Sequence, residues 1–235
     1  MRWLLAALLA WGAVPGGAAC RQALALGLDV SGSVDAQEYH LQTQGLANAL
    51  QRPEVLEAIL AFPGAPVRLM VFEWAGQGSR RVLVPWSDLP DLGAVDAVAA
   101  QLLGTSRVPF DPATAIGEAM QFGLGELVQQ GDCWKHTLDV SGDGKSNSGP
   151  RPRDLPDLVF GQEITVNGLV IGADAPATGD TRQTEINELW AYYKVEVIRG
   201  ENAFIEVALG FEDFEDAMAR KLLRELETLA VSSLD

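Results

Sequence analysis

The sequence predicts an α/β protein: a single doubly wound, mostly parallel sheet with one antiparallel edge strand and helices on both faces. Short apolar runs of β type alternate with longer segments whose apolar residues recur at helical spacing, which is the pattern of such sheets. Two β-type runs, 66–75 and 80–86, are separated only by the turn residues 76–79, so they predict the antiparallel hairpin. No linker long enough to divide residues 20–235 is present, so one domain is expected.

The first half of the chain begins with an apolar run at 23–28, which predicts a buried strand. Asp35 with Glu38 three residues later resembles a capping box, so a helix is expected to start there and to run to about Leu50. Pro53 breaks that helix. The elements expected next are a short helix at 54–61, the two hairpin strands, a helix at 92–103, a loop at 104–113 and a helix at 115–129.

The second half contains a strand at 135–140 that ends in Ser-Gly-Asp-Gly, and a strongly β-type run at 164–172. The last helix, 211–229, is amphipathic, and its acidic residues precede its basic ones, as the helix dipole favours. Its apolar residues recur every four positions: Phe214, Met218, Leu222 and Leu226. The other elements expected are a short helix after the proline-rich segment 151–156, a helix at 185–195 and a strand at 203–208.

The charge of the chain argues against two classes of partner. Its 235 residues carry 32 acidic and 17 basic side chains, a formal net charge of -15. Nucleic acid and anionic membrane surfaces both require a basic face, so neither is expected as a ligand. Such an acidic chain is compatible with a bound cation or a basic partner, and the same charge also serves solubility alone.

Residues 1–19 have the features of a secretory signal peptide. Arg2 supplies the positive charge, 3–14 the apolar segment and 15–19 the small residues of a cleavage site. The apolar segment is too short to span a bilayer and no later run approaches about 18 residues, so no transmembrane segment is expected in the mature chain. The protein is therefore expected to be periplasmic or secreted, with 20–235 as its mature domain.

Cys20 and Cys133 are the only cysteines, and each opens a predicted strand. If these strands are parallel neighbours, their first residues lie side by side, where a disulfide is geometrically reasonable in an oxidising compartment. The alternative is a lipoprotein in which Cys20 is acylated after cleavage. Gly17, three positions earlier, is not the larger apolar residue that a lipobox prefers.

Oxygen-bearing side chains gather where predicted strands end. The run LDVSGSV leads from a buried strand into a tight turn with three of them: Asp29, Ser31 and Ser33. A carboxylate and two hydroxyls suit a hard cation better than a nucleophile. Thr114 and Asp143 fall at the same edge of the predicted sheet, where doubly wound sheets bind their ligands.

Three motifs in this order resemble the von Willebrand factor type A (vWA) domain, from about residue 21 to the end. DVSGS (29–33) is similar to the D-x-S-x-S motif of that family, TAIGEAM (114–120) to its T-x-T-G-x-A-L segment, and SGDGKSNSG (141–149) to its T-D-G-x-x-N segment. Within the superfamily, the secretory signal, the paired cysteines and the DVSGD form most resemble a bacterial family of unknown function, DUF1194.

The resemblance implies a metal-ion-dependent adhesion site (MIDAS), in which hydroxyls and carboxylates hold Mg²⁺ or Mn²⁺. The implied ligands, direct or through water, are Asp29, Ser31, Ser33, Thr114 and Asp143. Because few of these are charged, the ion keeps positive charge, and an acidic residue of a protein partner can fill an open position. The implied role is binding, so the protein is not expected to be an enzyme.

Two positions depart from the family pattern. Ile116 replaces a second threonine, and Gly142 replaces the threonine before the second aspartate. Lys145 is expected to point to solvent. A purely structural interpretation also exists, in which the turn after the first strand only begins a helix that Ser33 or Asp35 caps.

Asp139 leaves a second alternative open. Because LDVSG occurs twice, at 28–32 and at 138–142, Asp139 could be the true second acid of the site, or a buried structural carboxylate. Asp143 is favoured, because Gly144 and Asn147 extend the family-like segment.

Three functions therefore compete. The leading one is a secreted, metal-dependent protein-binding module. The second is a metal-dependent hydrolase acting on a phosphorylated or acidic substrate, which needs a general base near the ion, and only Asp139 offers one. The third is a structural domain whose site is empty and which the disulfide stabilises.

Overall fold

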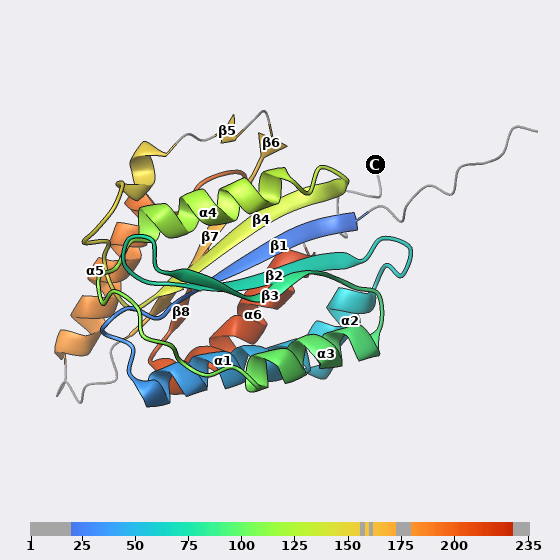
Figure 1. The fold of residues 1–235 in the computed structure, drawn as a ribbon, viewed down its shortest axis with the longest axis horizontal. Helices are drawn as coiled ribbons and strands as arrows, with labels where there is room; N and C mark the ends of the chain where they lie inside the picture. The colour runs from blue at the N-terminus through green and yellow to red at the C-terminus, as the bar shows by residue number, and fades with distance from the viewer. Residues whose placement is uncertain (1–19, 156–157, 160–161, 173–179, 228–235) are drawn as a thin grey trace, which may run out of the picture.

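Six strands form one twisted sheet in the computed structural model, which describes residues 20–155, 158–159, 162–172 and 180–227 (Figure 1). The strand order is β3-β2-β1-β4-β7-β8, and all neighbours are parallel except the edge strand β3, which is antiparallel to β2. This confirms the predicted α/β sheet. The strands are β1 (Cys20–Asp29), β2 (Val67–Trp74), β3 (Arg80–Leu89), β4 (Cys133–Gly142), β7 (Thr165–Ile171) and β8 (Ile205–Ala208).

Helices cover both faces of the sheet (Figure 1). One face carries α1 (Ala36–Leu50), α2 (Pro53–Leu60), α3 (Leu92–Leu103) and α6 (Phe214–Glu227), and the other carries α4 (Ile116–Val128) and α5 (Asp180–Glu196). All ten residues of β1 are buried. Because β1 lies between two strands and beneath helices on both sides, it has no solvent face, which explains its nearly continuous apolar sequence.

The order of the strands reverses between β1 and β4. The chain builds β2 and β3 on one side of β1 and then returns to place β4 on the other side. Leu28 pairs with Ser141, so the two strands end level with one another at Asp29 and Gly142. Such a switch point leaves a crevice outside the carboxyl ends of the strands, and it is here that ligands bind in open α/β sheets.

The structure differs from expectation after the proline-rich segment 151–156. A short helix was predicted there, and this prediction is wrong. The segment forms a single 3₁₀ turn, Pro152–Asp154, and the described residues that follow pair as a small antiparallel sheet of β5 (Leu158–Val159) and β6 (Gln162–Glu163). Prolines lack the backbone N–H that a helix interior uses, so they favour short turns. The expected signal peptide, 1–19, lies outside the described residues.

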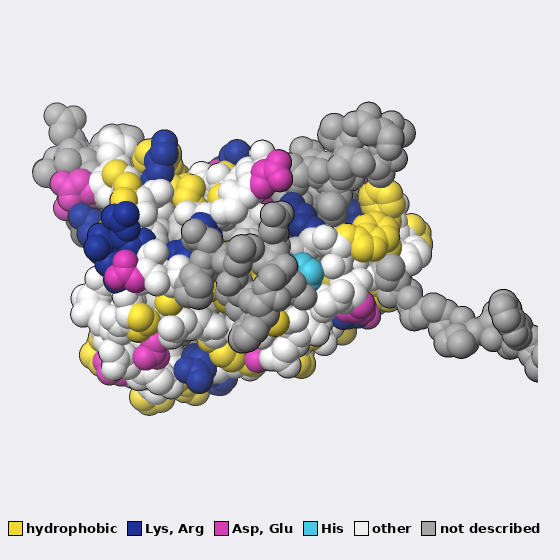
Figure 2. All heavy atoms as spheres, turned by 90° about the horizontal axis from the view of Figure 1, so that it is seen from above, with side chains coloured by type: hydrophobic (Ala, Val, Ile, Leu, Met, Phe, Trp, Pro, Cys, Tyr) yellow, Lys and Arg dark blue, Asp and Glu magenta, His cyan; other side chains and the backbone are white. Residues whose placement is uncertain are grey.

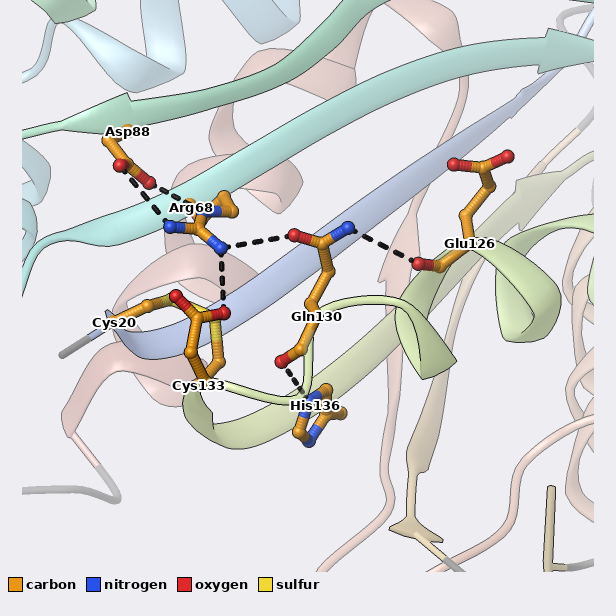
Figure 3. The surroundings of a disulfide bond; sticks show 8 residues. Cys20, Arg68, Asp88, Glu126, Gln130, Cys133 and His136 are labelled. Atoms are coloured by element: carbon orange, nitrogen blue, oxygen red, sulfur yellow. Dashed lines mark hydrogen bonds and ion pairs between the residues drawn. A yellow bond between two sulfur atoms is a disulfide. The ribbon is translucent and has the colours of Figure 1, made fainter. Parts of the chain in front are cut away.

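A disulfide joins Cys20 to Cys133 at the amino ends of β1 and β4 (Figure 3). The two residues are partners in the strand register, with their Cα atoms 4.3 Å apart. The predicted disulfide is confirmed, and it uses the sulfur that the lipoprotein alternative required. Beside it, Arg68 binds Asp88 and Asp132. The bond therefore pins the two central strands at the end opposite to their carboxyl termini. No helix among the described residues is long and apolar enough to cross a membrane.

Candidate metal site at the carboxyl ends of β1 and β4

The turn after β1 holds Asp29 in a fixed, buried position. Its Oδ1 accepts a hydrogen bond from the backbone N–H of Ser31 over 2.8 Å, and its side chain has no exposed surface. Gln42 of α1 donates to the carbonyl oxygen of Asp29 over 2.9 Å. The turn is thus tied both to itself and to the helix that follows.

Asp35 caps α1. Its Oδ1 accepts from the backbone N–H groups of Gln37 and Glu38, and Glu38 Oε2 accepts from the N–H of Asp35, so the predicted capping box is confirmed. Ser33 takes no part in this cap. The structural interpretation of the turn therefore accounts for Asp35 and leaves the oxygens of Asp29, Ser31 and Ser33 unexplained.

A relay of side-chain contacts connects the turn after β1 to the turn after β4. Ser31 Oγ lies 3.2 Å from Ser33 Oγ, which in turn donates to Asp143 Oδ1 over 2.7 Å. Ser31 is buried, whereas Ser33 is exposed and Asp143 is half-buried. The group is consequently closed at Asp29 and open to solvent at the Ser33–Asp143 edge.

Thr114 is attached to the same edge through the segment after Asp143. Its backbone N–H donates to Asn147 Oδ1, and its carbonyl oxygen accepts from the Asn147 N–H, both over 2.9 Å. A Cβ atom built on Gly144 would stand 4.0 Å from Thr114 Oγ1. The structure thus brings all five predicted residues, from three separate loops, to one end of the β1–β4 pair.

The two carboxylates are electrostatically unfavourable in the absence of a cation. Burial, and then the charge of Asp143, raise the pKa of Asp29 to about 7. Burial also raises the pKa of Asp143, against the hydrogen bond from Ser33. Each raised pKa means that the folded protein disfavours the ionised form: burial is the main cause for both carboxyl groups, and the charge of Asp143 adds to it at Asp29.

Asp139 is not part of this group. Leu138 and Val140 pack toward α4 and α5, so Asp139, between them, faces α6. There it contacts the ammonium group of Lys221, which is 2.8 Å from Glu225 Oε1, and all three residues are buried. In the strand register Asp139 is level with Leu26, three residues before the end of β1. Of the two interpretations, the structure therefore supports the buried structural carboxylate.

The two departures from the family pattern have different structural settings. Ile116 is fully buried in the core beneath α4. Gly142 stands beside Asp29, where a Cβ atom would lie 2.9 Å from Asp29 Oδ2 and 2.7 Å from the hydroxyl of Tyr193. Lys145 is exposed and pairs with Glu188 over 3.3 Å, as expected for a side chain that points away from the site.

Sequence analysis missed two residues that touch this region. Arg107 donates to the carbonyl oxygens of Val30 and Ser31, both over 3.3 Å, and so braces the turn after β1. Tyr193 of α5 places its hydroxyl beside Gly142, in the space that Asp29 Oδ2 also borders. Neither belongs to a motif, although a glycine inside a β-type run, such as Gly168 beside Tyr193, can mark the close approach of another group.

The donor set fits a hard divalent cation. Asp29 Oδ2 is buried and has no hydrogen-bond partner in the part of the chain that the structure describes, and the serine hydroxyls can turn their lone pairs toward an ion. Two carboxylates and three hydroxyls are the oxygen ligands that Mg²⁺ and Mn²⁺ prefer, whereas zinc sites usually use nitrogen and sulfur. Among the described residues, no group of three or more His, Cys, Asp or Glu is placed to hold a metal ion.

The fold is that of a vWA domain. A von Willebrand factor type A structure from Catenulispora acidiphila is 16% identical, with a TM-score of 0.55, over 88% of this chain and 43% of that one. Proximal thread matrix protein 1 from the mussel byssus, with a zinc-occupied MIDAS motif, is 15% identical, with a TM-score of 0.58, over 89% and 46%. The open conformation of the pilus adhesin SpaC from Lactobacillus rhamnosus GG is 11% identical, with a TM-score of 0.54, over 88% and 30%.

These likenesses establish the fold, and the chain spans less than half the length of each of the three structures. The sequence belongs to the family described as "Protein of unknown function (DUF1194)", whose model matches residues 19–230. No curated protein sequence is a significant match.

Proposed function

We propose that this domain is an exported binding module that holds Mg²⁺ or Mn²⁺ at the five-residue site and, through the ion, contacts an acidic group of a protein partner. The observation that carries the proposal is the relay from buried Asp29 through Ser31 and Ser33 to Asp143, which is closed on one side and open to solvent on the other. The zinc at the MIDAS motif of the mussel protein supports the idea that this fold can hold a divalent ion at such a motif.

The residues of the site divide into two roles. Asp29 and Asp143 supply negative charge, and the three hydroxyls of Ser31, Ser33 and Thr114 supply neutral oxygens. A bound divalent ion would supply a positive centre that a carboxylate can coordinate. Ser33 and Asp143 form the accessible rim, so an acidic group would approach from their side. The existing hydrogen bonds hold the oxygens near their working positions before an ion arrives, which reduces the ordering that binding requires.

Export forms part of the proposal. Residues 1–19 act as the signal peptide and 20–235 as the mature domain, in the periplasm or outside the cell. The disulfide supports this, because such bonds persist in oxidising compartments. On the α4–α5 side of the molecule, the basic side chains that can be seen lie among acidic and uncharged ones (Figure 2). The formal net charge of -15 supports a protein partner over nucleic acid, which requires a basic face.

The hydrolase alternative gains no support from the described residues. The base that it required was Asp139, which is buried against Lys221 on the α6 side of the sheet. The open Ser33–Asp143 edge favours a role in binding.

Titration with Mn²⁺ tests the proposal directly. Wild-type protein freed of metal with chelator is expected to bind one Mn²⁺, and Asp29→Asn to lose that binding. Asp96→Asn is the matched control, because it removes an equal charge from an exposed position of α3. It should bind Mn²⁺ as wild type does. Equal Mn²⁺ binding by wild type and Asp29→Asn would refute the site.

The open position can be tested with the same ion. Mn²⁺ that keeps exchangeable water in a protein site enhances the relaxation of water protons. Adding a peptide with an aspartate side chain should reduce that enhancement, and the matched asparagine peptide should not. An enhancement that neither peptide changes would contradict the role assigned to a carboxylate.

A further inference from the structure

Tyr193 has a buried hydroxyl group that makes no hydrogen bond to the described residues. The side chain is fully buried and lies in the last turn of α5. A buried phenol without a partner loses its hydration and gains nothing in return, so such groups are uncommon. Asp29 Oδ2 is a second buried oxygen without a partner.

These two oxygens face the same small space. The position where a Cβ atom on Gly142 would stand is 2.7 Å from the Tyr193 hydroxyl and 2.9 Å from Asp29 Oδ2. The two oxygens are therefore close enough for a small side-chain rotation, or one shared water molecule, to join them. The chemistry is complementary, because the phenol can donate a proton and an ionised carboxylate can only accept one.

Two glycines on neighbouring strands make room for this side chain. A Cβ atom on Gly168 of β7 would stand 2.7 Å from Tyr193 Cδ1, just as one on Gly142 of β4 would meet the hydroxyl. Val140 pairs with Gly168, so the two glycines lie diagonally across the β4–β7 pair. The tyrosine side chain therefore lies over both glycines, with its hydroxyl beside Gly142. Glycine in the middle of a strand is unfavourable in itself, and close approach of another group is one reason to retain it.

The same end of α5 also supports the other half of the site. The neighbouring Tyr192 accepts a hydrogen bond from the backbone N–H of Ser146 over 3.3 Å. Ser146 Oγ in turn donates to the carbonyl oxygen of Thr114 over 3.2 Å. Two consecutive tyrosines thus contact both the segment that holds Thr114 and the pocket that holds Asp29.

We propose that Tyr193 is a positioning residue of the metal site, whose hydroxyl donates to Asp29 Oδ2 across the space that Gly142 leaves open. This inference rests on the proposed function. With Oδ1 bound to the N–H of Ser31 and Oδ2 to Tyr193, both oxygens of Asp29 are oriented, and the carboxylate cannot rotate away from an ion.

The first test is Mn²⁺ affinity. Tyr193→Phe keeps the ring and removes only the hydroxyl, and it should weaken Mn²⁺ binding about tenfold, as is usual for residues that orient a ligand. Tyr39→Phe is the matched control, because it removes a buried hydroxyl that donates to Glu73, and it should bind Mn²⁺ as wild type does. Unchanged affinity in Tyr193→Phe, with wild type binding normally, would overturn this role alone. A wild-type protein that binds no Mn²⁺ would overturn the role and the proposed function together.

The second test needs no metal. Urea unfolding in EDTA is measured for wild type, Tyr193→Phe, Asp29→Ala and the double variant. If the hydroxyl serves Asp29, Tyr193→Phe lowers the unfolding midpoint of wild type and leaves that of Asp29→Ala nearly unchanged. Equal shifts in both backgrounds would mean that the hydroxyl does not act on Asp29.

Discussion

Ser33 and Asp143 are 110 residues apart in the sequence, yet Ser33 Oγ donates a hydrogen bond to Asp143 Oδ1 over 2.7 Å. This bond joins the turn after β1 to the turn after β4 at the point where the strand order reverses. Both side chains reach solvent, so an arriving cation would meet this pair first.

Removing the Ser33–Asp143 hydrogen bond should weaken metal binding while leaving the free energy of unfolding nearly unchanged. Ser33→Ala deletes a proposed ligand, so Mn²⁺ affinity should fall about tenfold or more. The free energy of unfolding without metal should change by less than about 1 kcal/mol, because the lost hydrogen bond is exposed. Ser87→Ala removes an exposed hydroxyl from β3 and should change neither quantity. Wild-type Mn²⁺ affinity in Ser33→Ala would exclude this residue from the site.

Metal removal should make stability depend on pH in a defined direction. The pKa of Asp29 is raised to about 7 by burial and then by Asp143, against about 3.9 in the unfolded chain. Between these values the folded state binds more protons than the unfolded one. Protonated Asp29 therefore makes its full contribution to the free energy of unfolding below about pH 4. This contribution is lost as the pH rises through about 7, and the loss is up to about 4 kcal/mol.

Urea unfolding at about pH 5 and about pH 8 in EDTA measures this dependence. Mn²⁺ should restore stability at the higher pH, because the ion favours the ionised carboxylates. Asp29→Asn, which cannot titrate at this position, should lose less stability than wild type over the same interval. A wild-type protein in EDTA that becomes more stable from the lower to the higher pH, relative to Asp29→Asn, would contradict the pKa.

The buried group at Asp139 should matter for stability alone. Lys221→Met leaves Asp139 and Glu225 buried without the cation that both contact, which should cost about 3 to 5 kcal/mol. Arg220→Met, one residue earlier, breaks a pair with Glu206 in which the arginine is half exposed, and should cost less than about 1 kcal/mol. Mn²⁺ affinity at a temperature where both variants are folded should equal that of wild type. A large loss of Mn²⁺ affinity in Lys221→Met would indicate that Asp139 takes part in the metal site.

Gly142→Ala should disturb the site by crowding. The new methyl group would meet Asp29 Oδ2 at 2.9 Å and the Tyr193 hydroxyl at 2.7 Å, so both must move. A cost of about 1 to 3 kcal/mol in unfolding free energy is expected, together with weaker Mn²⁺ binding. Gly125→Ala is the contrasting control: its added methyl group meets nothing within 4 Å, and it lies inside α4, where alanine is favoured by about 1 kcal/mol. Normal stability and affinity in Gly142→Ala would show that the space beside Asp29 is larger than described.

Loss of the disulfide should destabilise the domain without altering the site. Cys20 and Cys133 close a loop of 113 residues, worth about 4 to 5 kcal/mol in the chain-entropy model. Urea unfolding of the Cys20→Ser, Cys133→Ser double variant measures this loss, and Mn²⁺ affinity under folding conditions should be unchanged because the bond lies at the opposite ends of β1 and β4. A stability equal to that of wild type would show that strand pairing alone holds these ends together.

The large elements could be predicted because their signals are local. The apolar run before Asp29, the hairpin turn at 76–79 and the capping box at Asp35 each act over a few residues, and each is found as expected. The short helix predicted after 151–156 failed, because β5 and β6 are two residues each, too short for a periodic signal.

The sequence by itself determined the kind of fold, the pairing of the cysteines and the set of five residues that gather where β1 and β4 end. These could be predicted because the motifs and the ends of the strands are marked by residues that are close together in the sequence. Only the tertiary structure showed that Asp143 contacts Ser33 whereas Asp139 contacts Lys221 on the other side of the sheet. Side chains alternate between the faces of a strand, and the position of Asp139 in β4 turns it toward Lys221, which α6 brings from 82 residues further along the chain. Tyr193 could be recognised only in the tertiary structure for the same reason: its position beside Gly142 and near Asp29 depends on how α5 packs across two strands, which no local pattern records.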